Sequence, residues 1–242
     1  MAIILKPRHT IDKMKYLIIL ILPIIISCNI NSGNIDEDNL RKYNISDEFL
    51  ARGLVKKFIF KSPKDTTFIY DKIIRQNDTI ISKRYNDKFL LVRDDINKIN
   101  KNEWTLISRA QIGTDRKRYN QEMVIPYKTS FNPNDRILES LIQSAPIEGY
   151  IFKNYEKRTL LNKSVQNYKG KQINCIRYNS EMIYTVHEIS TSKVVKEIIK
   201  NGYSLFGEEI GWFYFEWKEN NETQSLELLE IMTIDKFEKN KL

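Results

Sequence analysis

The stretch that decides the fold is Ile210-Gly211-Trp212-Phe213-Tyr214-Phe215-Glu216-Trp217. Successive side chains of a β-strand point to opposite faces, so Trp212 and Tyr214 should share one face and the other three aromatic residues the opposite face. Both faces are then apolar, and such a strand needs cover on both sides. The stretch therefore belongs in the centre of a curved sheet or barrel, with Trp212 and Tyr214 as candidate ligand-facing residues.

The chain around this stretch consists of short runs rich in β-branched and aromatic residues, separated by polar turns. Such a pattern is typical of an antiparallel meander. The runs are Leu54–Lys61, Thr66–Arg75, Thr79–Tyr85, Lys88–Arg93, Trp104–Ile112, Glu122–Tyr127, Gly149–Tyr155, Lys171–Tyr178, Met182–Glu188 and Gln224–Thr233. The sequence predicts a mainly β (α+β) fold: a curved antiparallel sheet or half-open barrel with one or two helices packed on it.

One helix is predicted after Asn132. Asn132 can cap it, Pro133 suits the first helical position, and Asp135 complements the positive helix end. Pro146 would end the helix. The apolar residues that would share one helical face and pack on the sheet are Ile137, Leu138, Leu141, Ile142 and Ala145.

The segment from Ser192 to Gly202 is open to two interpretations. Its four apolar residues have helical spacing, and Gly202 could end a helix. All four are β-branched, which favours a strand instead. They are Val194, Val195, Ile198 and Ile199.

The N-terminus has the pattern of a secretory signal peptide. Lys13 and Lys15 precede an apolar run from Tyr16 to Ile26, and Ser27-Cys28 follows it. A positive start, a short apolar run and a small residue at the cut site are the three parts of such a signal. The run is shorter than the about 20 apolar residues that span a bilayer. Translation could start at Met1 or at Met14.

Ile25-Ile26-Ser27-Cys28 resembles the lipobox of bacterial lipoproteins. The resemblance implies cleavage between Ser27 and Cys28, a diacylglyceryl group on the Cys28 thiol, and acylation of the new amino group with a chain such as palmitate. Several acyl chains give durable membrane anchoring where one would be marginal. Two alternatives stay open: a cleaved signal without lipid, and an uncleaved apolar segment in which Cys28 is an incidental thiol.

Three regions follow from this interpretation: a signal peptide at 1–27, a flexible polar tether at 28–45 and one β-rich domain at 46–242. With Cys28 acylated, Cys175 has no partner for a disulfide within the chain, because the sequence has 2 cysteines. We expect Cys175 to be a buried small hydrophobe. Gly170–Cys175 followed by Phe206–Trp212 weakly resembles the late strands of half-barrel envelope lipoproteins, which favours a curved sheet over a flat one.

The charge pattern argues against a nucleic-acid binder. The formal net charge is +8, and the residues before Cys28 contribute +3, which leaves about +5 (8 − 3) for the remaining chain. Basic residues are scattered or lie in the stretch 153–171, and we interpret them as solvated faces. No nucleic-acid partner is predicted.

No catalytic, metal or cofactor motif is present. The 2 histidines are His9, which is lost with the signal, and His187. A His-rich zinc site is therefore excluded, and a Cys-His pair would have to join Cys175 to His187. We find no phosphate-binding glycine loop and no nucleophile elbow.

The sequence favours a non-enzymatic protein of the cell envelope, held on the outer rather than the inner membrane by lipid on Cys28. Its β-rich domain would bind a ligand or an envelope protein. The alternative is an envelope hydrolase that uses carboxylates or His187. It predicts a cleft where at least two ionisable side chains converge.

Overall fold

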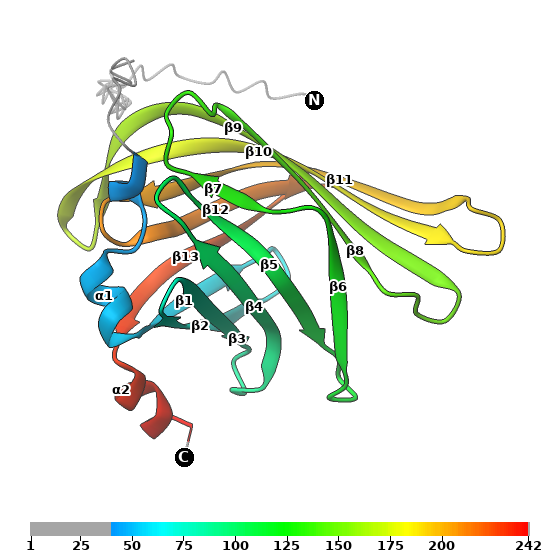
Figure 1. The fold of residues 1–242 in the computed structure, drawn as a ribbon, viewed down its shortest axis with the longest axis horizontal. Helices are drawn as coiled ribbons and strands as arrows, with labels where there is room; N and C mark the ends of the chain where they lie inside the picture. The colour runs from blue at the N-terminus through cyan, green and yellow to red at the C-terminus, as the bar shows by residue number, and fades with distance from the viewer. Residues whose placement is uncertain (1–39, 242) are drawn as a thin grey trace, which may run out of the picture. The chain divides into compact units, whose positions relative to one another are not determined.

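The computed structural model describes residues 40–241, in which thirteen β-strands form one antiparallel sheet (Figure 1). The strands are β1 (Leu54–Lys61), β2 (Thr66–Gln76), β3 (Thr79–Tyr85), β4 (Leu91–Ile99), β5 (Glu103–Ile112), β6 (Arg118–Ile125), β7 (Lys128–Ser130), β8 (Ile137–Ser144), β9 (Tyr150–Tyr168), β10 (Lys171–Glu188), β11 (Val194–Gly207), β12 (Gly211–Glu219) and β13 (Glu222–Met232).

The sheet closes on itself into a barrel. Its order is β4-β3-β2-β1-β13-β12-β11-β10-β9-β8-β6-β5, and a further pairing of β4 with β5 joins the two ends. That pairing runs from Arg93 opposite Gln111 to Ile99 opposite Trp104. β7 pairs with β5 beside this ring, so twelve of the thirteen strands form the barrel. The predicted mainly β antiparallel fold is confirmed, and the barrel is closed rather than half-open.

Three short helices flank the strands: η1 (Leu40–Tyr43, a 3-10 helix), α1 (Asp47–Arg52) and α2 (Ile234–Lys239). Ser46 caps α1, because the Phe49 N–H donates to Ser46 Oγ at 3.3 Å. α2 places Phe237, which is fully buried, against Tyr70 and Tyr85 at ring-centroid distances of 5.6 and 5.3 Å. α2 thus covers an apolar patch on β2 and β3.

The prediction of a helix after Asn132 is wrong, because residues Ile137–Ser144 form strand β8. Burial alternates along β8: Leu138, Ser140, Ile142 and Ser144 are buried, while the residues between them are more exposed. The period is therefore two, and β8 is held by ladders to β6 and β9. Neighbouring strands, which the local pattern cannot reveal, override the helical spacing.

The basic stretch from residue 153 to 171 is strand rather than loop. It belongs mostly to β9, which pairs with β10 along its whole length. The segment from Ser192 to Gly202, for which the sequence allowed either a helix or a strand, belongs to strand β11 from Val194 onward. Figure 1 shows that β9, β10 and β11 run past the other strands as a projecting ribbon.

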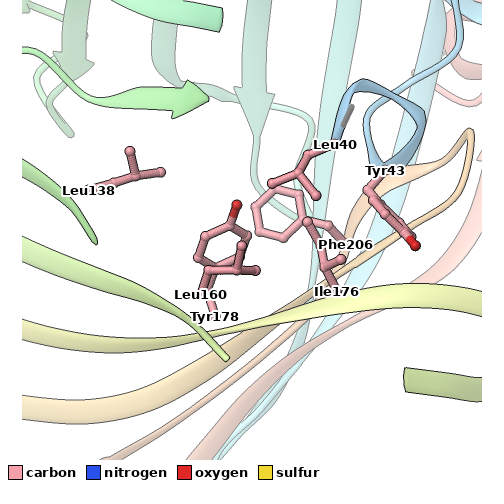
Figure 2. Packing of buried hydrophobic residues seen from close by; sticks show 7 residues of the cluster. All are labelled: Leu40, Tyr43, Leu138, Leu160, Ile176, Tyr178 and Phe206. Atoms are coloured by element: carbon pink, nitrogen blue, oxygen red, sulfur yellow. The ribbon is translucent and has the colours of Figure 1, made fainter. Parts of the chain in front are cut away.

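The segment Leu40–Ser46 packs against the barrel and is bonded to the turn between β11 and β12. The Glu209 N–H donates to the Lys42 carbonyl, and the Ser46 N–H donates to the Glu209 carbonyl, both at 2.8 Å. Leu40 and Tyr43 are 1% and 2% exposed. Figure 2 shows the cluster in which they pack with Leu138, Leu160, Ile176, Tyr178 and Phe206.

Residues 40–45, predicted as the end of the tether, are therefore part of the folded body. The rest of the predicted tether and the predicted signal peptide lie outside the described residues. Within residues 40–241, no helix has the length and apolar character needed to cross a membrane.

Candidate functional site

A cavity of about 540 Å³ lies inside the barrel. This volume is in the range of small-molecule sites in proteins, about 300–1,000 Å³. All strands of the ring except the neighbours β6 and β8 contribute to its lining, and Asn44 and Ile45 of the N-terminal segment line it as well. Much of the wall is aromatic, including Phe60, Trp104, Tyr127, Trp212, Phe215 and Trp217.

A β-bulge at Phe213 decides which aromatic residues face the cavity. Leu205 pairs with Tyr214 and Phe206 pairs with Trp212, so Phe213 has no partner on β11. The extra residue shifts the alternation by one position. Trp212 therefore lines the cavity together with Phe215, and not together with Tyr214 as the sequence predicted.

Tyr214 is placed away from the cavity lining. Its hydroxyl donates to Glu216 at 2.8 Å, and its ring lies 5.7 Å from that of Tyr203. Of the two candidate ligand-facing residues, Trp212 is in position to contact a ligand in the cavity. Strict alternation, which would put Tyr214 on the same face as Trp212, does not hold across this bulge.

Two carboxylates in the cavity wall are held by arginines from neighbouring strands. Asp71 accepts two hydrogen bonds of 2.7 Å from Arg84. Asp95 accepts bonds of 2.8 and 2.9 Å from Arg109, and Arg93 lies 3.1 Å from the same carboxylate. All five residues line the cavity. Both carboxylates thus already have cationic partners.

Arg93 shares its counter-ion with Arg109, and the surroundings are strongly cationic. Burial, together with Arg84 and Arg109, lowers the pKa of Arg93 to about 9. Two guanidinium groups near a third disfavour its charged form.

Lys56 reaches into the same cavity from β1. It is 3% exposed, and its ammonium group donates to the carbonyls of Trp212, at 2.8 Å, and Ile210. Burial lowers the pKa of Lys56 to about 7, although Asp71 acts in the opposite direction. The ammonium group is thus bonded to two backbone carbonyls of the β12 region.

Arg158 of β9 is the most isolated buried cation of the lining. The residue is 2% exposed, and its guanidinium lies 3.9 Å from the centre of the Tyr127 ring. Nη2 donates to the Lys128 carbonyl, whereas Nη1 is buried without a hydrogen-bond partner among the described residues. Trp104 and Trp217 likewise each have a buried indole N–H with no acceptor in the described part of the chain. All three residues line the cavity, and these three donors lack an acceptor among the described residues.

The other candidate residues from the sequence are not brought together. Cys175 and His187 both lie on β10, twelve positions apart (187 − 175), so a Cys-His pair is not formed. His187 Nε2 is 2.9 Å from Thr185 Oγ1. Cys175 is fully buried beside Ser164, as predicted, and burial raises the pKa of its thiol.

The proposed lipid-attachment residue Cys28 and the cleavage-site residue Ser27 lie outside the described residues. Across residues 40–241, no cluster of three or more His, Cys, Asp or Glu side chains could hold a metal ion.

Sequence reasoning missed the buried charges Lys56, Asp71 and Arg158. The first two had a readable signal. Lys56 shares its strand face with Leu54 and Phe58, both buried. Asp71 lies between two isoleucines at positions 69 and 73, with the same spacing. A charge on an otherwise apolar strand face is a candidate interior group.

Comparisons with known proteins identify the fold. No protein-family model matches the sequence, and no curated protein sequence matches it at a significant level. Two solved structures are similar. A candidate lipoprotein from Parabacteroides distasonis has 11% identity and a TM-score of 0.53, and the match covers 81% of this chain and 100% of that one.

The second is a candidate exported protein with YmcC-like fold from Bacteroides fragilis. It has 9% identity and a TM-score of 0.53, with 75% of this chain and 96% of that one covered. At these identities the similarity concerns the fold. The barrel is thus an architecture shared with two bacterial proteins of the Bacteroides group.

Proposed function

We propose that this protein is a lipid-anchored protein of the cell envelope whose barrel binds a small amphipathic ligand, without catalysing a reaction. The observation that carries the binding role is the cavity of about 540 Å³ with its aromatic wall. Aromatic and apolar walls with a few placed polar groups are typical of small-molecule sites. A barrel whose interior is not filled by its own side chains can hold one ligand.

The anchor is proposed from the lipobox-like sequence that ends at Cys28. The two similar structures support this placement, because one is described as a lipoprotein and the other as exported. The proposed arrangement is a signal peptide at 1–27, a tether from Cys28 and the β-rich domain beyond it. The outer membrane is the proposed location.

The hydrolase alternative is less well supported. Asp71 and Asp95 are each bound by arginine. Burial raises the pKa of Asp71, but Arg84, with Arg93 and Lys56, outweighs burial and lowers it overall. Such a carboxylate is unsuited to donate a proton. His187 is bonded to Thr185 and is not among the residues that line the cavity.

The cavity can be tested with the fluorescent apolar probe N-phenyl-1-naphthylamine. We expect saturable binding to the wild type with enhanced emission, and loss of binding in Ser82→Trp, which fills the cavity without removing a large side chain. Ser82 lines the cavity. Its matched control is Ser225→Trp, because Ser225 is next to the lining residue Leu226 but does not itself line the cavity. Equal binding by both variants would contradict the proposal.

The anchor can be tested by intact-mass analysis of protein extracted from membranes. We expect a mature chain that starts at Cys28 and carries acyl chains. The Cys28→Ala variant should remain uncut and lack lipid. An unmodified wild-type cysteine, or a wild type that washes freely into buffer, would contradict the anchor without affecting the cavity.

A further inference from the structure

We infer that the ligand is an acidic amphiphile, and that its carboxylate or phosphate group binds at the buried guanidinium of Arg158. This inference rests on the proposed function, because it identifies the chemical class of the ligand in the same cavity. Its support comes from the charges of the lining, the contacts of Arg158 and the position of the aromatic wall.

The lining holds more cationic than acidic side chains. Six basic residues contribute to it: Lys56, Arg84, Arg93, Arg109, Arg158 and Lys200. Three acidic residues contribute: Asp71, Asp95 and Glu156. Lys200 has its own partner, Glu219, at 2.8 Å. With that pair set aside, five basic groups face three acidic groups, and two of the acidic groups are already held by arginine.

Arg158 is the basic residue in the lining whose charge is least compensated. Glu156 lies two positions away on β9, but no ion pair joins the two among the described residues. The contacts of the Arg158 guanidinium are a carbonyl and an aromatic face, with Nη1 left without an acceptor. An unpaired buried cation and an unmet buried donor are both costly. A ligand anion at Nη1 would balance the positive charge of Arg158 and accept the missing hydrogen bond.

The surroundings of Arg158 contain two further guanidinium groups and one carboxylate. Tyr127, which packs on the Arg158 guanidinium, is within the electrostatic reach of Arg109, Arg93 and Glu156. Cationic groups therefore outnumber acidic ones around this ring. Arginine recognises carboxylate and phosphate through charge-assisted hydrogen bonds, which are stronger than neutral ones.

Aromatic side chains of β12 and β1 would contact the apolar part of the ligand. The rings of Phe215 and Trp217 are stacked at 4.9 Å, and Phe60 lies 5.9 Å from Trp217. All three line the cavity. The cavity therefore combines an aromatic surface with a buried anion site, which fits a single-chain acidic amphiphile better than a neutral or cationic one.

The test compares twelve-carbon compounds that differ in their head group, as competitors of bound N-phenyl-1-naphthylamine. We expect dodecanoate or dodecyl phosphate to displace the probe at concentrations about ten-fold or more below dodecanol, which corresponds to about 1.4 kcal/mol. Dodecylammonium should be weaker than dodecanol. The order of dodecanoate and dodecyl phosphate identifies which acidic head group is preferred.

The variant Arg158→Met should reduce the preference for the acidic compounds over dodecanol, measured against the probe bound to the same variant, to less than about three-fold. Lys157→Met is the matched control, because Lys157 is the neighbouring position on β9 and does not line the cavity. Acetate and inorganic phosphate should displace the probe poorly, since they lack a chain.

The outcomes separate the two proposals. Probe binding to the wild type with equal displacement by dodecanoate, dodecanol and dodecylammonium overturns the acidic ligand and leaves the binding function standing. No probe binding overturns the function itself. The wild-type series needs no variant, so it decides the question even where Arg158→Met does not fold. An unchanged acidic preference in folded Arg158→Met would overturn the assignment to Arg158.

Discussion

Asp71 and Arg84 face each other across β2 and β3 inside the barrel, joined by two hydrogen bonds of 2.7 Å. Their side chains are 8% and 17% exposed, so the pair is largely shielded from water. Neither charge could remain there alone at low cost. The loss of either partner of such a buried ion pair leaves the other charge without a counter-ion and lowers the stability of the folded protein.

The variant Asp71→Asn should therefore destabilise the protein by about 3–5 kcal/mol, because it leaves a buried guanidinium without its counter-ion. Urea unfolding followed by tryptophan fluorescence measures the change. Glu48→Gln is the control: Glu48 pairs with Arg52 at 2.8 Å, but their side chains are 72% and 76% exposed. The control should shift stability by less than about 1 kcal/mol. Similar midpoints for the two variants would disprove the expectation.

Stability should rise with pH above about 7 because of Lys56. The folded-state pKa of Lys56 is lowered from 10.5 to about 7, so between these values the unfolded chain binds the proton and the folded protein does not. The free energy of unfolding should gain up to about 1.4 kcal/mol per pH unit from this residue within that window.

The difference between the wild type and Lys56→Met isolates this effect. Thermal unfolding from pH 7 to 9 should give a steeper rise of Tm for the wild type than for Lys56→Met. Lys61→Met, at an exposed residue of the same strand, should keep the wild-type slope. Parallel pH profiles for the wild type and Lys56→Met would mean that Lys56 keeps its proton in the folded protein.

Gly202→Ala should destabilise the barrel where β11 and β12 come close together. A Cβ at Gly202 would lie 2.1 Å from the Glu216 carbonyl oxygen and 2.8 Å from Trp217 Cα, both backbone atoms. Strands must move apart to make room, which costs about 1–3 kcal/mol or more. At Gly113 a new Cβ would meet side-chain atoms of Asp115 and Tyr119 rather than backbone atoms, and side chains can shift more easily, so Gly113→Ala should cost less. Chemical denaturation of both variants gives the comparison.

The Cys175 thiol should resist modification in the folded protein. It is fully buried, and burial raises its pKa, so little of the reactive thiolate is present near neutral pH. In the Cys28→Ala variant, Ellman's reagent should therefore detect almost no thiol before unfolding and one thiol per chain in urea. Rapid full labelling of the native variant would show that the β9–β10 region opens readily.

The positions of most strands could be read from the sequence, because runs rich in β-branched and aromatic residues, separated by polar turns, mark them. The closure of the barrel could not, because it requires β1 to pair with β13 from the other end of the chain, and that pairing depends on the accumulated twist and stagger of twelve strands. The apolar spacing from Ile137 to Ile142 is compatible with a helix as well as a strand, and only the ladders to β6 and β9 decide between them.

Part of the cavity lining could be predicted from the sequence. Trp212 lines the cavity, whereas the bulge at Phe213 places Tyr214 outside the lining. A one-residue bulge has no clear local signal in an all-aromatic run. The buried Lys56 had such a signal, because its neighbours two positions away on either side are apolar. Scattered charges were interpreted as solvated, and four of them are buried in the cavity wall: Lys56, Asp71, Asp95 and Arg158.

The chain enters the barrel at Leu40, whose backbone N–H bonds the Phe131 carbonyl at 2.9 Å, and the same segment provides Asn44 and Ile45 to the cavity wall. A force applied from the N-terminal side therefore acts on this segment before it acts on the hydrogen bonds between the strands. Under the proposed anchoring through Cys28, a pulling force would reach the cavity wall at Asn44 and Ile45 before it reaches the strands, which would link tension on the protein to the shape of the cavity.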